Sequence, residues 1–312
     1  MNIRNRVFSF EQLPSSDLIL DANYKGGNQK NAGDDPISKL MGCGNQGGFR
    51  YKGSLVEDKI ELCVLYSELS DPDWPDALDL ESGIFTYYGD NKKPGYRLND
   101  TKKKGNLILE RAFGSLHTGE RSLIPPFFVF TKGFKGRDVI FRGLAVPGVK
   151  TMSQSDDLIA VWKTKNAQRF QNYKASFTIL NIEFASRAWI RDLWMGNPLS
   201  DNTPIQWKTW VDIGEYVPLL APKTKKYRTK TEQLPSTKLE EKVLRCVVSY
   251  FKSHQDREYA FEKCAAELAR LMDSNIIEYD LSRYWRDGGR DAVGKQNRHP
   301  GYLDYCSFCS RS

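Results

Sequence analysis

Short β-rich runs separated by turn residues occupy the chain from about Val56 to Arg187, and they constrain its fold more than any other feature. Three of these runs cover residues 60–66, 126–130 and 176–182, with Gly, Asp and Asn between such runs. Short apolar runs bounded by turn residues are typical of strands that follow one another in hairpins. The pattern therefore predicts a mainly antiparallel β domain.

A polar, basic segment divides the chain after this region. It is rich in Lys, Thr and Pro and lacks hydrophobic periodicity, which is typical of a linker. A chain of 312 residues is also long enough for two domains of ordinary size. We therefore expect a first domain over residues 1–220, a basic linker over 221–238 and a second domain over 239–312.

Helical periodicity begins directly after the linker. Apolar residues recur there every four positions, which places them on one stripe of a helix; they are Leu239, Val243, Val247 and Phe251. A second helix is predicted over residues 258–272. A strand is predicted over 276–279. The C-terminal part therefore starts as helix, helix, strand.

The charge balance bears on the partner. A formal net charge of +7 favours an anionic partner such as nucleic acid over an acidic protein. No apolar run approaches the length of a membrane span, and the first residues lack the apolar stretch of a signal peptide. We expect a cytoplasmic protein that does not enter a membrane. The six scattered cysteines are expected to be reduced thiols.

Residues 71–95 concentrate aromatic, carboxylate and lysine side chains. A nucleic-acid base that is extruded from a duplex needs flat rings on its faces and a polar group at its pairing edge, while cations hold the flanking phosphates. This segment supplies all three residue types. The competing interpretation is that its aromatic residues belong to an ordinary strand core.

Asp79, Gly83 and the run Phe85-Thr86-Tyr87 resemble the motif of the SRA domain, the fold that flips 5-methylcytosine out of duplex DNA. The resemblance implies that Asp79 pairs with the amino edge of the flipped cytosine. It also implies that Tyr87 stacks on one face of the base. Trp74 is our candidate for the opposite face.

Two further segments suit contacts in a DNA groove, because glycines allow close approach while amides and cations contact bases and phosphates. Their alternative interpretation is a set of solvated loops. The candidate residues in them are Asn45, Gln46, Arg50, Lys92 and Lys93, with Lys102 to Lys104 following.

The arrangement as a whole resembles modification-dependent restriction endonucleases of the AspBHI and MspJI kind, whose N-terminal domain is SRA-like. The likeness runs from the first residues to about Gly294. It implies that the partner is double-stranded DNA containing modified cytosine. Because relatives assemble as multimers, a homo-oligomer is also expected.

The second domain resembles the Mrr-like branch of the PD-(D/E)XK nucleases at Phe261-Glu262 and at Gly288-Gly289-Arg290-Asp291. Such enzymes use carboxylates to hold Mg²⁺ against the scissile phosphate. By this resemblance Asp291 is the metal-binding catalytic carboxylate and Glu262 an auxiliary catalytic carboxylate. Arg286 or Arg290 would contact phosphate.

The tail departs from that family. Few residues follow Asp291, and they hold neither the Gln-x-Lys of the next catalytic strand nor a convincing strand pattern. We therefore expect an incomplete nuclease domain that is poorly ordered from about Tyr279 onward. DNA binding is predicted, and cleavage by this chain is not.

The predicted fold class is α+β. An SRA-like twisted β-barrel or sheet with flanking helices would be followed by an incomplete α/β restriction-endonuclease-like domain. The leading function is a modification-dependent, type II-like restriction endonuclease that recognises 5-methylcytosine by base flipping and, in complete relatives, cleaves at a distance. The alternatives are a non-catalytic methylated-DNA-binding module and an RNA-modification or nucleotide-binding protein with the same aromatic pocket.

Overall fold

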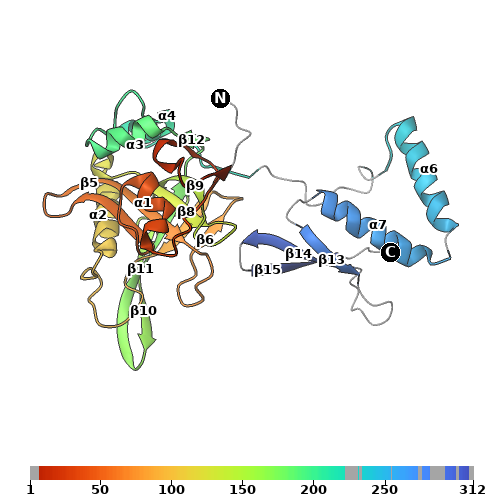
Figure 1. Ribbon diagram of the computed structural model, residues 1–312, viewed down its shortest axis with the longest axis horizontal. Coiled ribbons are helices and arrows are strands. Elements are labelled where there is room, and N and C mark those ends of the chain that lie inside the picture. Colours follow the sequence, from red (N-terminus) through yellow and green to blue (C-terminus); the bar gives the residue numbers. More distant parts are fainter. Residues whose placement is uncertain are drawn as a thin grey trace. The chain divides into compact units, whose positions relative to one another are not determined.

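The structure is a computed structural model that describes residues 7–221, 231, 234–253, 255–272, 276–281, 292–299 and 302–308. The chain divides into unit 1, Met1–Lys223, and unit 2, Thr224–Ser312 (Figure 1). Most of the predicted linker lies outside the described residues. Each unit is considered by itself.

A mixed sheet of ten described strands forms the centre of unit 1 (Figure 1). The strands of the unit are β1 (Val7–Phe8), β2 (Leu18–Ile19), β3 (Asn23–Tyr24), β4 (Phe49–Ser54), β5 (Lys59–Ser67), β6 (Ala77–Asp79), β7 (Ile84–Tyr88), β8 (Phe127–Lys132), β9 (Val139–Pro147), β10 (Leu158–Lys165), β11 (Gln168–Ile179) and β12 (Phe184–Ala185). The main path runs β4-β5-β8-β9-β11-β7-β6, and β2 pairs separately with β12.

The described strand pairs of unit 1 are mostly antiparallel, as predicted. The parallel pairs are β5 with β8 and β1 with β3. Strands β4 and β6 end the path without pairing to each other, so the sheet is open and twisted and is not a closed barrel. The part of the prediction that allowed a barrel is therefore wrong.

Helices flank this sheet (Figure 1). They are α1 (Pro36–Met41), α2 (Gly105–Thr118), α3 (Arg187–Trp194) and α4 (Ile205–Ile213). Side chains cap two of their N-termini: Asp35 accepts from the Ser38 N–H, and Ser186 accepts from the Trp189 N–H. In Figure 1, α3 and α4 lie at the end of unit 1 opposite to the projecting β10.

The core of unit 1 is aromatic. Strands β8 and β9 are buried along nearly their whole length, which explains their continuous apolar sequences, because both faces of the sheet are covered there. Trp189 and Trp207 pack in the same core with ring centroids 6.3 Å apart and their planes tilted by 54°. The buried cluster extends from Leu13 to Trp210 and belongs entirely to unit 1.

A buried guanidinium ties the N-terminal segment to α3. Arg187 donates hydrogen bonds to the backbone carbonyls of Leu13, Ser16 and Leu40. Burial lowers the pKa of Arg187 to about 10. These bonds supply the partners that a buried charge requires.

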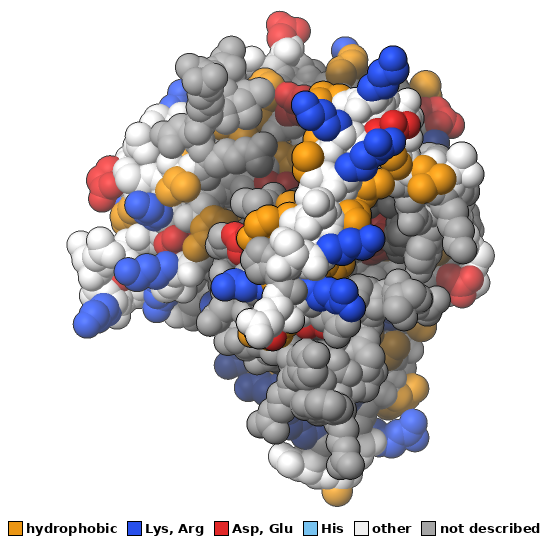
Figure 2. Space-filling view, turned by 90° about the vertical axis from the view of Figure 1, so that its right-hand side faces the viewer, with side chains coloured by type: hydrophobic (Ala, Val, Ile, Leu, Met, Phe, Trp, Pro, Cys, Tyr) orange, Lys and Arg blue, Asp and Glu red, His pale blue; other side chains and the backbone are white. Residues whose placement is uncertain are grey.

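Unit 2 contains the helices α6 (Lys238–Lys252) and α7 (Arg257–Met272) and the strands β13 (Ile276–Leu281), β14 (Ala292–His299) and β15 (Tyr302–Phe308). The order helix, helix, strand is as predicted. A capping box starts α6, with Thr237 and Glu240 each accepting from the other's backbone N–H. On the face seen in Figure 2, hydrophobic side chains lie between Lys and Arg side chains.

The expectation that the tail lacks strands is wrong. β13 pairs with β14, and β14 pairs with β15, in a three-stranded antiparallel sheet. The pairing explains the error, because backbone hydrogen bonds form a hairpin here without a strongly apolar sequence.

Among the described residues, no helix is long and apolar enough to cross a membrane.

Candidate functional site

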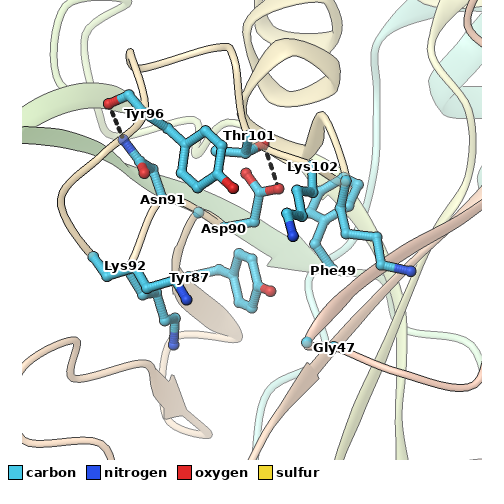
Figure 3. Close-up of a pocket in the computed structure, with 13 residues that line it drawn as sticks. Gly47, Phe49, Tyr87, Asp90, Asn91, Lys92, Tyr96, Thr101 and Lys102 are labelled. Atoms are coloured by element: carbon cyan, nitrogen blue, oxygen red, sulfur yellow. Dashed lines mark hydrogen bonds between the residues drawn. The ribbon is translucent and has the colours of Figure 1, made fainter.

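A pocket of about 330 Å³ opens beyond the C-terminal end of β7 (Figure 3). We call it the lysine-rimmed pocket. Its walls come from the segment before β4, the end of β7 and the loop that leads to α2. The lining residues are Gly47, Gly48, Phe49, Tyr87, Gly89, Asp90, Asn91, Lys92, Lys93, Tyr96, Thr101, Lys102 and Lys103.

A second pocket of about 290 Å³ adjoins the first and shares Gly48 and Lys92 with it. We call it the acidic pocket, because three carboxylates line it. Its residues are Gly48, Tyr66, Ser67, Glu68, Ser70, Asp71, Asp76 and Lys92. The chain thus places an acidic hollow next to one that carries four lysines.

Gly48 marks the junction of the two pockets. A Cβ atom at this position would lie 2.8 Å from the Tyr66 carbonyl oxygen and 3.0 Å from the Tyr87 hydroxyl. Both distances are shorter than ordinary carbon contacts. A larger side chain would therefore displace the walls of both pockets.

Asp76 supplies a buried carboxylate to the acidic pocket. It is 7% exposed, and it accepts hydrogen bonds from the Ser67 hydroxyl at 2.7 Å and from the Tyr88 backbone N–H at 2.7 Å. Burial raises the pKa of Asp76, and Lys92, with its Nζ 4.0 Å from the carboxylate, acts against that rise. Because a carboxylate has about four acceptor positions, two remain for a ligand.

Asp90 serves mainly to hold α2. Its carboxylate accepts from the backbone N–H groups of Gly105 and Asn106 and from the Thr101 hydroxyl (Figure 3). These bonds satisfy N–H groups that have no partner inside the helix. Asp90 thereby fixes the loop that carries the lysines of the rim.

Tyr87 lines the lysine-rimmed pocket, but its ring is 1% exposed. The ring packs against Phe49 and Phe85, with centroids 6.4 and 5.9 Å away. Burial, followed by the nearby Asp76 and Asp90, raises the pKa of the Tyr87 hydroxyl well above its ordinary value. In this conformation neither face of the ring is open to a stacking base.

The structure does not bring Asp79 and Tyr87 together. Asp79 pairs with Ile84 across the β6–β7 hairpin, and directly paired residues point to the same face of a sheet. Tyr87 lies three residues beyond Ile84 and so points to the opposite face. The Asp79 carboxylate instead accepts from the Ser82 hydroxyl and the Glu81 N–H in the turn. The expectation of a shared base-sized hollow is therefore wrong.

The same register brings Asp76 to the face of the sheet that Tyr87 occupies. The hairpin pairs Ala77 with Thr86, so one step further brings Asp76 opposite Tyr87. The two residues then share a face. The β6–β7 hairpin thus brings Asp76, and not Asp79, to the acidic pocket.

Trp74 does not line either pocket. Its ring packs against Tyr88 and Phe170, with centroids 5.6 and 5.9 Å away, and the Lys163 ammonium lies 4.8 Å from its centroid. Its indole N–H donates to the Lys92 carbonyl at 3.3 Å. Trp74 therefore supports the backbone of Lys92, and its predicted place on the open face of a base is wrong.

Arg50 is buried and paired. Its guanidinium lies 2.6 Å from Asp35 and donates to the carbonyls of Gly44 and Gly47. A side chain with these partners shapes the glycine loop and does not reach outward to phosphate, which contradicts its predicted role. Such a pair is costly to break, because either partner alone leaves a buried charge.

The remaining predicted contacts are exposed, except for Lys92, which is partly buried. Asn45 and Gln46 lie on the surface of the glycine loop, and Asn45 donates to the Ala32 carbonyl at 3.1 Å. Lys92 and Lys93 line the lysine-rimmed pocket as part of its cationic edge. Among the predicted site residues, the structure thus brings Tyr87, Lys92 and Lys93 to one pocket.

Sequence reasoning missed three residues of these pockets. Asp76 lies in the segment 71–95 that was singled out for its carboxylates, but its burial depends on the hairpin register. Tyr66 ends a strand that reads as uniformly buried. Tyr96 is 37% exposed and extends its ring into the lysine-rimmed pocket (Figure 3), from a loop without periodicity.

The predicted nuclease residues lie in unit 2. Glu262 is on α7 and partly buried, whereas Asp291, Arg286 and Arg290 lie outside the described residues. Within the described residues, no three His, Cys, Asp or Glu side chains gather as a metal site would require. Metal binding by Asp291 and the role of Glu262 stay predictions.

Comparison with protein families gives one decisive match. The family described as Restriction endonuclease AspBHI N-terminal matches residues 18–222. The chain belongs to this family. The AspBHI N-terminal match spans both pockets and confirms the resemblance seen in the sequence. No match was found among curated proteins.

Solved structures agree with the AspBHI N-terminal assignment. The DNA recognition domain of the cytosine modification-dependent restriction endonuclease LpnPI is 48% identical, with a TM-score of 0.66, over 70% of this chain and 98% of that chain. The DNA modification-dependent restriction endonuclease AspBHI is 46% identical, with a TM-score of 0.66, over 69% of this chain and 100% of that chain. Unit 1 is therefore a homologue of such recognition domains.

Proposed function

We propose that this chain recognises modified cytosine in double-stranded DNA by holding the extruded base in the acidic pocket. The observation that carries the proposal is the buried carboxylate of Asp76 in a hollow that adjoins a lysine-rimmed one. A flipped nucleotide complements both features: its base carries an amino group, which suits the carboxylate, and its phosphates carry negative charge, which suits the lysines.

Asp76 is suited to the pairing edge of cytosine. The exocyclic amino group of cytosine is a donor, and a carboxylate is a strong acceptor for it. Both oxygens of Asp76 are already oriented by Ser67 and Tyr88, so that little movement is needed on binding. Glu68 and Asp71 add negative charge to the same pocket, which disfavours a phosphate there.

Tyr66 is the aromatic residue best placed to contact the base. It lines the acidic pocket and is partly exposed, unlike Tyr87. The Arg50 guanidinium lies 5.9 Å from the centroid of its ring, and its hydroxyl reaches Glu68 at 3.4 Å. A ring held in this way offers a rigid surface for stacking.

The lysine-rimmed pocket is suited to the flanking phosphates. Lys92, Lys93, Lys102 and Lys103 surround it, and cations at such positions release counterions from DNA on binding. Gly44 lies close to Lys103, since a Cβ there would be 3.9 Å from the Lys103 Nζ. The two predicted groove segments thus meet at this rim.

The test compares two aspartates of one segment. The wild type, Asp76→Asn and the control Asp79→Asn are titrated with duplexes that differ by a single 5-methylcytosine, and 2-aminopurine next to that base reports its extrusion. Asp76→Asn is expected to lose about 1–3 kcal/mol of the preference for the methylated duplex. Asp79→Asn is expected to keep that preference, because its carboxylate serves the turn.

Two outcomes would contradict the proposal. One is equal binding of both duplexes by the wild type. The other is an unchanged preference in Asp76→Asn. Competition by single-stranded RNA or free nucleotide, stronger than by the methylated duplex, would favour the RNA or nucleotide interpretation instead.

A further inference from the structure

A two-stranded hairpin, β10–β11, projects from the body of unit 1 (Figure 1). Its strands pair antiparallel from Leu158 with Ala175 to Lys165 with Gln168. The turn consists of Asn166 and Ala167, with φ of 50° and 58°. Positive φ at both central residues matches the natural twist of a tight hairpin. The ribbon is therefore a defined arm with a fixed direction.

The arm exposes an aromatic residue and a cation together. Trp162 is 55% exposed, and the Arg169 guanidinium lies 4.5 Å from the centroid of its ring. An exposed indole ring offers a large flat surface, and its N–H can also donate to a polar partner. Stacking on a guanidinium holds the ring in one orientation and keeps a positive charge beside it.

The charge of the arm selects its partner. Residues 158–174 contain Lys163, Lys165, Arg169 and Lys174 and no acidic residue. Lysines on an edge strand such as β10 oppose pairing with a second copy of the chain. A cationic two-stranded ribbon has the width that the major groove of duplex DNA accepts.

The arm is tied to the lysine-rimmed pocket and to the loop that contains Asp73. The Asn91 amide, in the lysine-rimmed pocket, donates to the Gln171 carbonyl at 2.8 Å, and the Asn91 N–H donates to the Asn172 side chain at 3.2 Å. Nearer the turn, the Lys163 ammonium contacts the Asp73 carbonyl, and the Lys165 ammonium lies 3.4 Å from the Asp73 carboxylate. The position of the arm is therefore set relative to the site.

The reach of the arm can be derived from its register. Lys174 pairs with Tyr88 at the end of β7, and the chain continues from there to the turn at Ala167. At about 3.3 Å per residue this spans roughly 20 Å, or about six base pairs of duplex. Arg169 lies five residues along this stretch, about 16 Å along the strand from the end of β7.

We propose that the β10–β11 hairpin is a second contact with duplex DNA, which touches the backbone and groove several base pairs from the held base through Trp162 and Arg169. The inference rests on the proposed function for its ligand. It assigns the arm to affinity and leaves the choice of modified base to the acidic pocket, because phosphate contacts carry no sequence information.

The test uses the full chain with Trp162→Ala and Arg169→Gln, with Arg169→Lys to restore the charge. Lys208→Gln on α4 is the control, because that helix lies at the opposite end of unit 1 (Figure 1). Binding to methylated and unmethylated duplexes is measured from low to moderate salt, and thermal unfolding shows that each variant is folded.

Both hairpin variants are expected to lose about tenfold in affinity for both duplexes, with an unchanged preference for methylation. Arg169→Gln is expected to reduce the slope of log K against log salt by about one, and Arg169→Lys to restore it. On duplexes trimmed to about three base pairs on the contacted side of the modified base, the variants and the wild type should bind alike.

Folded hairpin variants that bind like the wild type, with the same salt slope, would overturn the inference. This result is distinct from failure of the proposed function. A wild type without preference for methylated DNA, together with weaker binding by both hairpin variants, would refute the base pocket while supporting the arm.

Discussion

Asp76 and Asp79 carry the same carboxylate three residues apart and have opposite surroundings. Asp76 is buried, and burial raises its pKa. Asp79 is exposed in the turn, where the Ser82 hydroxyl and the Glu81 N–H lower its pKa. The difference follows from strand alternation, since an odd separation along a strand reverses the face. At the scale of single residues, the position of each aspartate along the strand therefore decides which of the two faces the pocket.

The raised pKa of Asp76 predicts how stability depends on pH. An aspartate whose pKa is higher in the folded than in the unfolded chain favours folding when protonated, and this contribution is lost as the pH rises through the folded-state pKa. Asp76→Asn removes that loss, and its amide can still accept from the Tyr88 N–H. The variant should therefore gain stability relative to the wild type as the pH rises from acid to neutral.

Urea unfolding at a series of pH values measures this difference. The control is Asp79→Asn. Because the pKa of Asp79 is lowered in the folded chain, its ionised carboxylate stabilises the fold above the ordinary aspartate pKa, and this stabilisation is lost as the pH falls. The stability of Asp79→Asn relative to the wild type should therefore change with pH in the opposite direction to that of Asp76→Asn. A stability difference between Asp76→Asn and the wild type that does not vary with pH would contradict the assignment of a buried, raised carboxylate.

At the scale of elements, hairpins and caps position the site. The β6–β7 hairpin brings Asp76 opposite Tyr87, and Asp90 caps α2 and holds the loop with the lysines. The hairpin and the helix cap each join segments that are close in sequence. The β10–β11 hairpin is held to the lysine-rimmed pocket by Asn91, whose side-chain amide donates a hydrogen bond to the Gln171 carbonyl on β11.

The turn of that hairpin makes a prediction of its own. Ala167 has a φ of 58°, a conformation that costs an L-residue about 1 kcal/mol and glycine little. Ala167→Gly should therefore stabilise the hairpin by up to about 1 kcal/mol. The same change at Ala160, inside β10, should destabilise it by about 0.5–1 kcal/mol.

Amide hydrogen exchange across the Trp162–Gln171 region measures how each substitution changes the stability of the hairpin. Slower exchange in Ala167→Gly and faster exchange in Ala160→Gly is the expected pair of results. Faster exchange in both variants would show that the left-handed conformation of Ala167 does not lower the stability of the hairpin.

At the scale of the whole molecule, unit 1 holds a complete core. Every buried residue of the hydrophobic cluster lies between Leu13 and Trp210, and the AspBHI N-terminal match ends at residue 222. A unit with its own core is expected to fold by itself. Both pockets and the projecting hairpin belong to this unit.

Residues 1–223 alone should therefore unfold in one cooperative transition and keep the preference for methylated duplex. Calorimetry and the duplex titrations described above measure these properties, with the full chain as control. A fragment that does not fold, or folds without binding the duplexes bound by the full chain, would show that unit 2 contributes to the site or to its stability.

The recognition of the family rested on particular residues that needed no tertiary information. The run Phe85-Thr86-Tyr87 after Gly83 and the β-rich spacing predicted an SRA-like domain, and the helices of unit 2 followed from apolar periodicity. Lys92 and Lys93 line the lysine-rimmed pocket, and they could be named as candidates because charge and local pattern are visible in the chain itself.

The pockets were decided by contacts that local sequence patterns do not show. Arg50 was assigned to phosphate from its charge, but Asp35 and two loop carbonyls bury it; Trp74 was assigned to the base, but Tyr88 and Phe170 cover it. The family and strand content follow from local patterns that every segment carries. Which aspartate reaches the acidic pocket depends on strand register and burial, because a shift of one residue moves a side chain to the other face of the sheet.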